Sequence, residues 1–126
     1  TGGDISGVSG LTNAVAIYST ARAFAALTSS GAVVTWGNGL FGGDSSAETG
    51  NLAGGNLSSG VAQVYSSGSH FVALKTDGSL VTWGYDLGGL YSVPSNLTNV
   101  VSVSSNSTSF AAICASTINF LVCHSE

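Results

Sequence analysis

The chain has 126 residues and a formal charge of −4, and only 6% of its residues are charged, against about 25% in a typical soluble domain. Its only basic side chains are Arg22 and Lys75. Two cations cannot follow a phosphate backbone or attract an anionic membrane, so the composition argues against nucleic-acid and membrane-surface binding. No apolar run approaches the roughly 20 residues that a membrane span needs.

Within this chain, one segment containing VTWG occurs twice. Trp36 and Trp83 are 47 positions apart, as are Phe24 and Phe71. A third copy, offset by 86 positions from the first, keeps Phe-Ala-Ala at Phe110 but has no Trp. This periodicity is typical of a tandem-repeat protein.

Each repeat contains three short segments in which apolar residues alternate, and these segments are rich in β-branched and aromatic residues, which indicates β-strands. The repeats are predicted at residues 1–41, 42–87 and 88–126 of a single domain. In chain order, the predicted strands are Val15–Tyr18, Ala23–Thr28, Ala32–Trp36, Val61–Tyr65, His70–Lys75, Ser79–Trp83, Val100–Ser104, Ser109–Cys114 and Ile118–Cys123.

Ser30-Gly31 and Asp77-Gly78 each separate two predicted strands. An Asp-Gly pair in this place predicts a two-residue hairpin turn, because that turn needs positive φ angles. Both faces of each sheet are then largely apolar, so each sheet needs cover on both sides, which stacked units can supply. The resulting register pairs Leu27 with Val34, Ala25 with Trp36, Leu74 with Val81 and Val72 with Trp83.

The sequence therefore predicts an all-β protein in which three propeller-blade-like repeats of antiparallel strands stack as an open array. A β-trefoil or β-prism with pseudo-threefold symmetry is the alternative, since three units of about forty residues also suit those folds. Large apolar residues at equivalent positions are expected to form the core of the repeats: Phe24, Leu27, Trp36, Phe71, Leu74, Trp83, Phe110 and Ile113.

The second repeat has a distinctive set of residues: Val61, Val64, Gly68, His70, Ala73-Leu74, Asp77-Gly78, Val81 and Trp83-Gly84. This pattern resembles the repeat of the regulator of chromosome condensation family, a family of β-propellers. The first repeat has Ala23 where the family has His, and Ser67 stands where the family has the glycine that Gly68 supplies one place later. The resemblance implies blade-like units and a scaffold role for His70. It implies no activity, because the shared residues belong to the scaffold.

Three blades cannot close a propeller ring, which takes about four to eight. A second copy is therefore expected to cover the two ends, either by a head-to-tail contact that generates a filament or in a dimer that closes a ring of six units. Neither end unit shows the polar residues of a capping repeat. The strands of both units remain apolar, with Ile17, Phe24, Ala26 and Leu27 in the first repeat and Ile113, Phe120, Leu121 and Val122 in the third.

Two features indicate a secreted glycoprotein. Sequons for N-linked glycans occur at Asn56, Asn96 and Asn106. Ser and Thr together make up 33 of the 126 residues, and glycans would keep such an uncharged surface soluble. Cys114 and Cys123 would lie opposite each other if their hairpin turned at Ile118-Asn119, and a disulfide there would contribute about 2–3 kcal/mol. The alternative is two buried thiols.

Residues for catalysis, a cofactor or a metal are not evident. His70 and His124 are the only imidazoles, and their spacing suggests no Ser-His-Asp arrangement. Asp4, Asp44 and Glu48 lie in Gly-rich segments but are too sparse for a calcium loop.

The sequence thus predicts a non-enzymatic, extracellular structural protein that self-assembles through its β-rich ends into a filament or surface layer. The alternative is a carbohydrate- or protein-binding module, in which the Trp residues would stack on sugar rings.

Overall fold

The computed structural model describes residues 5–45, 57–85, 99–107, 110–115 and 120–125, with side chains as far as residue 115. These ranges contain two short 3-10 turns, η1 (Leu11–Asn13) and η2 (Gly39–Phe41), and nine strands that match the predicted ones to within a few residues. The strands are β1 (Ala14–Ser19), β2 (Ala23–Thr28), β3 (Val33–Gly37), β4 (Val61–Ser66), β5 (His70–Lys75), β6 (Leu80–Gly84), β7 (Val100–Ser105), β8 (Phe110–Ala115) and β9 (Phe120–Ser125).

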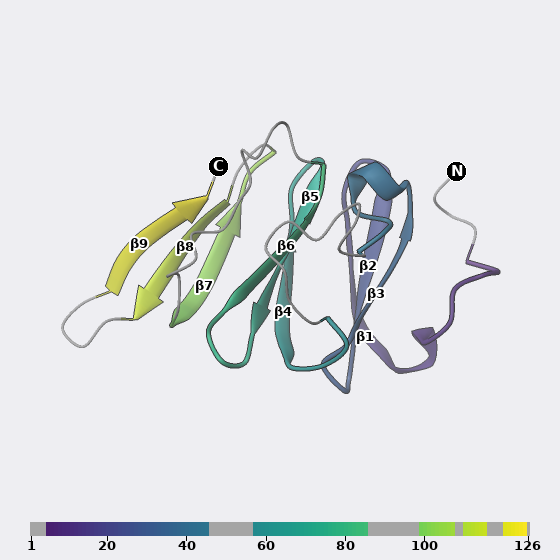
Figure 1. Ribbon diagram of the computed structural model, residues 1–126, viewed down its shortest axis with the longest axis horizontal. Coiled ribbons are helices and arrows are strands. Elements are labelled where there is room, and N and C mark those ends of the chain that lie inside the picture. The colour runs from purple at the N-terminus through teal and green to yellow at the C-terminus, as the bar shows by residue number, and fades with distance from the viewer. Residues whose placement is uncertain (1–4, 46–56, 86–98, 108–109, 116–119, 126) are drawn as a thin grey trace.

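The strands form three separate antiparallel sheets, one for each repeat, in the orders β1-β2-β3, β4-β5-β6 and β7-β8-β9. The sheets stand side by side in chain order, so that the first and third lie on opposite sides of the second (Figure 1). A trefoil or prism would place each sheet against both others. The observed architecture is the predicted open array of blade-like units.

The hairpin between β2 and β3 differs from the predicted two-residue turn. The Thr28 N–H donates to the Ala32 carbonyl at 2.9 Å, and Gly31 is the third loop residue, with a φ of 81°. This is the three-residue loop that ends on a left-handed residue. Leu27 therefore pairs with Val33. The second hairpin has the same loop, with Gly78 at a φ of 84°.

This one-residue difference moves both Trp side chains to the other face of their sheets, because strand side chains alternate. Phe24 pairs with Trp36, and Phe71 pairs with Trp83. The rings stack within each pair, with centroids 5.4 Å and 5.2 Å apart respectively. The predicted pairings of Ala25 with Trp36, Leu27 with Val34, Val72 with Trp83 and Leu74 with Val81 are wrong.

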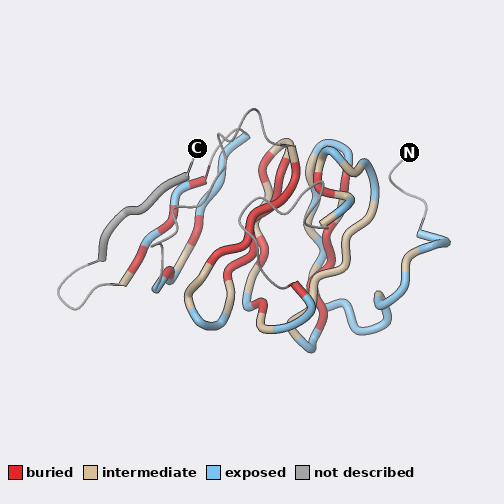
Figure 2. The backbone as a smooth tube through the Cα atoms, viewed as in Figure 1, coloured by how far each residue is buried: buried red, intermediate tan, exposed pale blue. Residues whose placement is uncertain are grey.

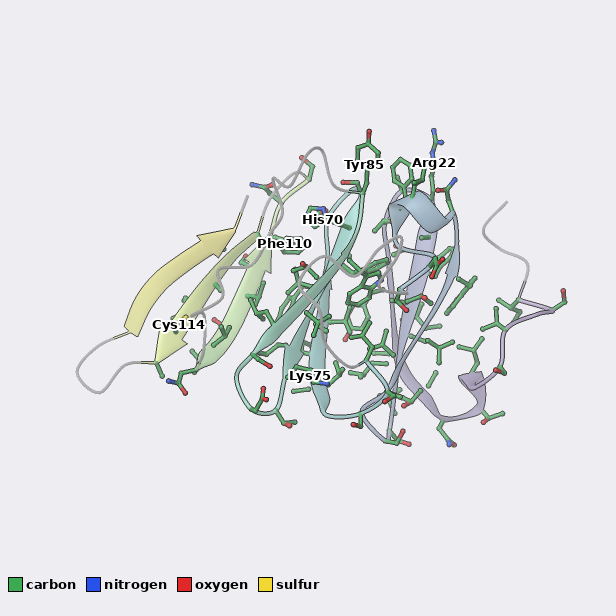
Figure 3. The ribbon with its side chains drawn as sticks, in the orientation of Figure 1. Arg22, His70, Lys75, Tyr85, Phe110 and Cys114 are labelled. Carbon is green, nitrogen blue, oxygen red and sulfur yellow. The ribbon has the colours of Figure 1, made fainter. Side chains whose placement is uncertain are left out.

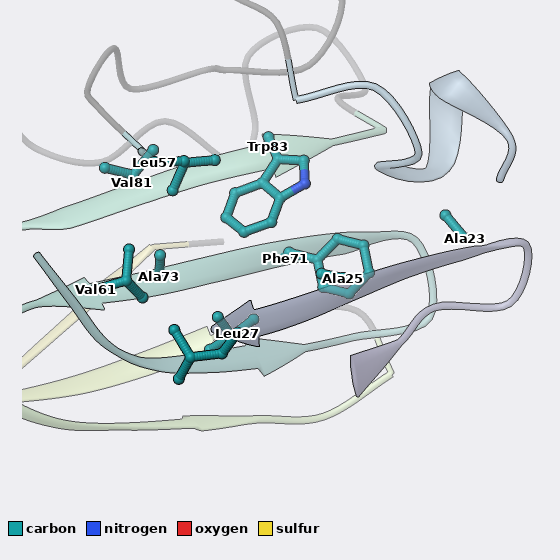
Figure 4. Close-up of a cluster of buried hydrophobic side chains, with 10 residues drawn as sticks. Ala23, Ala25, Leu27, Leu57, Val61, Phe71, Ala73, Val81 and Trp83 are labelled. Carbon is teal, nitrogen blue, oxygen red and sulfur yellow. The ribbon is translucent and has the colours of Figure 1, made fainter. Parts of the chain in front are cut away.

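Each sheet has a front face, directed toward the preceding repeat, and a back face, directed toward the following one. The front face of the second sheet packs on the back face of the first, in the cluster shown in part in Figure 4. The front face of the third sheet packs in the same way on the back of the second. The first cluster contains Ala23, Ala25, Leu27, Leu57, Val61, Val64, Phe71, Ala73, Val81 and Trp83, and the second contains Val72, Leu74, Leu80, Val100, Val103, Phe110, Ala112 and Cys114.

The first strand of every sheet has a bulge at the same place. The register of β1 shifts between Ala14 and Ala16, and β7 shifts between Val100 and Ser102. The residue inside the bulge is exposed, which explains why Val15 and Val101 face solvent. The exposure of these two valines thus follows from the bulge that each first strand shares.

Candidate assembly faces

The front face of the first sheet has no preceding repeat to cover it among the described residues. Ile17 is 61% exposed, and Phe24 and Trp36 are only partly buried. Their equivalents in the second sheet, Phe71 and Trp83, are both 0% exposed. Figure 2 shows this difference, since the residues coloured as buried are concentrated in the middle sheet. The front face is formed by Ile17, Phe24, Ala26, Val34 and Trp36, as their register requires.

The back face of the third sheet is the opposite end of the stack. Ile113 is 39% exposed there, although its equivalent in the second sheet, Leu74, is buried. Ala111 and Ser104 are exposed on the same face, and their register partners place them together. The described part of the molecule therefore ends in one incompletely covered sheet face on each side. On the front face of the first sheet, Ala26 is 0% exposed and Gly10 lies beside Val34, whereas Ile17 faces solvent.

The predicted core divides along these faces. Five of its members are buried as expected: Leu27, Phe71, Leu74, Trp83 and Phe110. The prediction is wrong for Phe24 and Trp36, which are only partly buried, and for Ile113, which is 39% exposed. The physical reason is their position, because each lies on an end face and no further sheet of this chain packs on it.

Both end faces are poor in charge. The described residues that form them are mostly aliphatic, aromatic or serine, with His124 as the register partner of Ala111 on the back face. Burying such surfaces would desolvate no carboxylate, ammonium or guanidinium group of these described residues, and burial of an unpaired charge is the costliest kind. Their chemistry therefore suits close contact with another sheet.

The covered front face of the second sheet shows how such a contact is completed. The Trp83 indole N–H donates to the Gly42 carbonyl at 3.1 Å, and Gly42 directly follows η2, which comes after the last strand of the first sheet. Phe41 from the same turn stacks on Tyr85 with ring centroids 5.7 Å apart. Arg22 lies over the Phe41 ring at 5.0 Å, at the edge seen in Figure 3. The segment that leaves the first sheet thus contacts the Trp and the Tyr at the end of the second sheet.

His70 lies inside the stack and is 0% exposed. Its Nδ1 is 2.7 Å from the Ser67 hydroxyl oxygen, and its ring meets Phe110 edge-on at 4.5 Å (Figure 3). The contact with Phe110 joins the second sheet to the third. Since solvent does not reach the ring, a substrate in solution could not contact it in this fold.

The predicted modification sites are only partly within the described residues. Asn106 is exposed just after β7, whereas Asn56 and Asn96 lie outside the described ranges. Cys114 pairs with Leu121, and Cys123 pairs with Ala112, so the predicted direct opposition of the cysteines is wrong. The cysteines lie two positions apart along the ladder, and Cys114 is disulfide-bonded in the structure.

The other ionisable candidates do not come together in the described structure. Asp44 is exposed, while Asp4 and Glu48 lie outside the described residues. Among the residues that are described, no group of three or more His, Cys, Asp or Glu side chains could hold a metal ion.

No protein-family model matches the chain, and no curated protein matches it either. The described parts of the structure hold no helix that is both long enough and apolar enough to cross a membrane.

Proposed function

We propose that this is a secreted, glycosylated and non-enzymatic structural protein whose copies assemble through the two end faces into a filament or surface layer. One observation supports this most directly. The front face of the first sheet repeats the Phe-Trp stack of the second, which in that sheet is completely buried by the preceding repeat.

Covering this face would release water from a substantial apolar area. Complete burial of a large apolar side chain contributes about 1.5–3 kcal/mol, and Ile17, Phe24 and Trp36 would each gain part of that. Association of two molecules costs about 4–15 kcal/mol in lost freedom, so the contact needs the opposite face as well. Ile113 and Ala111 on the third sheet provide exposed apolar surface on that face.

A heterologous contact between front and back faces leaves the same two faces free at the ends of every oligomer. It therefore continues as a filament unless the rotation between copies closes a ring. Two chains would supply six units, a number within the range that closes propellers. The family resemblance of the second repeat is compatible with that closed form, and both forms use the same faces.

The test is the size of the purified protein over a concentration series, measured by sedimentation velocity and electron microscopy. We expect oligomers or fibres in the natural sequence, and Ile17→Lys should abolish them by placing a charge in the contact. Leu40→Lys is the matched control, because Leu40 is 60% exposed, like Ile17 at 61%, but lies in η2 rather than on an end sheet face. A natural chain that stays monomeric at every concentration contradicts the proposal.

Glycosylation and secretion need a separate measurement. Intact mass before and after enzymatic deglycosylation, on protein from its natural source, should shift by the mass of one to three N-glycans. Asn106 is the accessible sequon within the described residues. An unshifted mass contradicts the glycoprotein part while leaving assembly untouched.

A carbohydrate-binding module is the second candidate, favoured by the partly exposed stack of Phe24 on Trp36. A flat aromatic surface of this kind can pack against the apolar face of a sugar ring. In that case the chain would be a monodisperse monomer that binds on a glycan array, and Trp36→Ala would remove the binding.

A further inference from the structure

A line of backbone hydrogen bonds crosses the stack at the loops that join the first and second strands of each sheet. The Ala21 N–H donates to the Gly68 carbonyl at 2.9 Å, and the Gly68 N–H donates to the Ser107 carbonyl at 3.2 Å. The three residues occupy equivalent positions in the three repeats. Each loop therefore donates to the following repeat and accepts from the preceding one.

This line has a direction, and its two ends lie on the end faces. Within the chain, Ala21 acts through its N–H and Ser107 acts through its carbonyl. The series would therefore continue from the Ser107 N–H at one end and from the Ala21 carbonyl at the other. Both residues are exposed. A Cβ on Gly68 would lie 3.0 Å from the Ser107 carbonyl oxygen, which shows how closely adjacent loops approach at this point.

Resting on the self-assembly proposed above, we propose that the contact between copies continues this line, with the Ser107 N–H of one copy donating to the Ala21 carbonyl of the next. The back face of the third sheet then lies on the front face of the next copy's first sheet. Every copy adds with the same polarity, and the junction reproduces the spacing between repeats within a chain.

The sizes of side chains on the back faces support this pairing independently. Ala25 lies on the back face that meets a Trp-bearing front face, and both belong to one cluster. Val72 occupies the equivalent position on the second sheet, which meets a front face that has Ser125 rather than Trp as the partner of Phe110. The third sheet has Ala111 at this position, as the first sheet does.

Within the chain, an alanine at this back-face position meets a sheet that has a Trp. A valine at the same position meets a sheet that has no Trp. By the same relation, Ala111 fits a front face that bears a Trp. The first sheet offers such a face, with Trp36. Contact between two front faces would instead bring two aromatic stacks together, without the small residue that accompanies a Trp in the chain.

The experiment is photo-cross-linking in assembled protein, with a diazirine amino acid placed at Ser107 in one sample and at Ala21 in another. Chains labelled with ¹⁵N are mixed with unlabelled chains, so that mass spectrometry separates cross-links between copies from those within a copy. Products within a chain, to the Gly68 loop, provide the control for the photoreaction in both samples.

We expect mixed-isotope products that join the Ser107 loop of one copy to the Ala21 loop of another, from either probe position. Products joining Ala21 to Ala21 or Ser107 to Ser107 would overturn the proposed polarity, as would oligomers in which the two loops never cross-link. Those results leave self-assembly intact. Protein that sediments only as a monomer would instead overturn the assembly proposal itself.

Discussion

The front faces of the first and second sheets have almost the same local structure but different surroundings. Phe24 stacks on Trp36 with an interplanar angle of 17°, and Phe71 stacks on Trp83 with an angle of 23°. The strand pairing is the same in both. Nevertheless, the second pair is completely buried and the first is partly exposed.

The difference teaches that burial in this chain depends on position in the stack. A repeat forms its hairpins and its aromatic stack from its own sequence, because the turn glycine and the alternation of apolar residues are local. Whether that stack is covered depends on the repeat before it. The predictions that follow test this separation between local structure and cover.

The largest expected effect comes from removing the covered Trp. Trp83→Ala should lower the free energy of unfolding by about 3–5 kcal/mol, as is typical for deletion of a fully buried aromatic side chain. It also removes the donor to the Gly42 carbonyl. Trp36→Ala should cost only about 1–2 kcal/mol, because part of that side chain is in water in the folded monomer.

Urea unfolding followed by circular dichroism measures both variants, at concentrations low enough to keep the protein monomeric. Equal losses would contradict the comparison, since they would mean that both Trp side chains are equally covered in solution. At concentrations that support assembly, the cost of Trp36→Ala should rise toward that of Trp83→Ala.

Gly42 tests the loop that completes the covered face. Its φ is +101°, and a Cβ there would lie 2.5 Å from the Phe71 ring. Gly42→Ala should therefore cost about 2–4 kcal/mol through overpacking and the left-handed backbone. Gly7→Ala is the matched control, because a Cβ at Gly7 meets nothing within 4 Å. Thermal unfolding of both variants should separate them, and similar midpoints would rule out the close approach of Gly42 to the Phe71 ring.

The next effect concerns the position at which the first two repeats differ. Ala23 is the equivalent of His70 in the first repeat. His70→Ala therefore gives the back face of the second sheet the residue that the first sheet has at this position. It removes the hydrogen bond with Ser67 and the edge contact with Phe110, at an expected cost of about 1–3 kcal/mol in urea unfolding.

His70→Asn keeps a polar group near the Ser67 hydroxyl but loses most of the ring. If His70→Asn is more stable than His70→Ala, the recovered part belongs to the hydrogen bond. If the two variants are equally unstable, the whole cost belongs to packing on Phe110. Full stability in both variants would contradict a packing role for His70.

Much of the fold could be predicted from the sequence, because the strands depend on local alternation. All nine strands coincide with predicted segments, and the stack follows from sheets that are apolar on both sides. The register could not be predicted in the same way. A glycine such as Gly31 suits either the second residue of a two-residue loop or the third of a longer one, and only the hydrogen bond from Thr28 to Ala32 decides between them.

The candidate site was harder to predict in detail. The absence of polar caps indicated exposed ends, but the same pattern also placed Phe24, Trp36 and Ile113 in the core. Equivalent positions have the same residues whether or not a neighbour covers them, so periodicity alone cannot separate the two cases. The contacts through Gly42 and along the Ala21, Gly68 and Ser107 loops depend on the distance between sheets, which no sequence pattern specifies.

The smallest expected effect distinguishes the two equivalent turns by pH. The Asp77 carboxylate accepts hydrogen bonds from the Ser79 hydroxyl at 2.6 Å and the Ser79 N–H at 2.9 Å, and these bonds lower the pKa of Asp77 from its usual 3.8. The first turn uses neutral groups instead, with the Thr28 and Ser30 hydroxyl oxygens 3.0 Å apart. Because the folded pKa is the lower one, the stabilising contribution of Asp77 is present above pH 3.8 and is lost as the pH falls through the folded value.

Asp77→Ser, which copies Ser30, should therefore be slightly less stable than the natural chain at neutral pH and lose that difference in acid. Thermal midpoints of both proteins across the acidic range measure the effect, and two curves that stay parallel to the lowest pH would show that the Asp77 carboxylate is not held by Ser79 in solution.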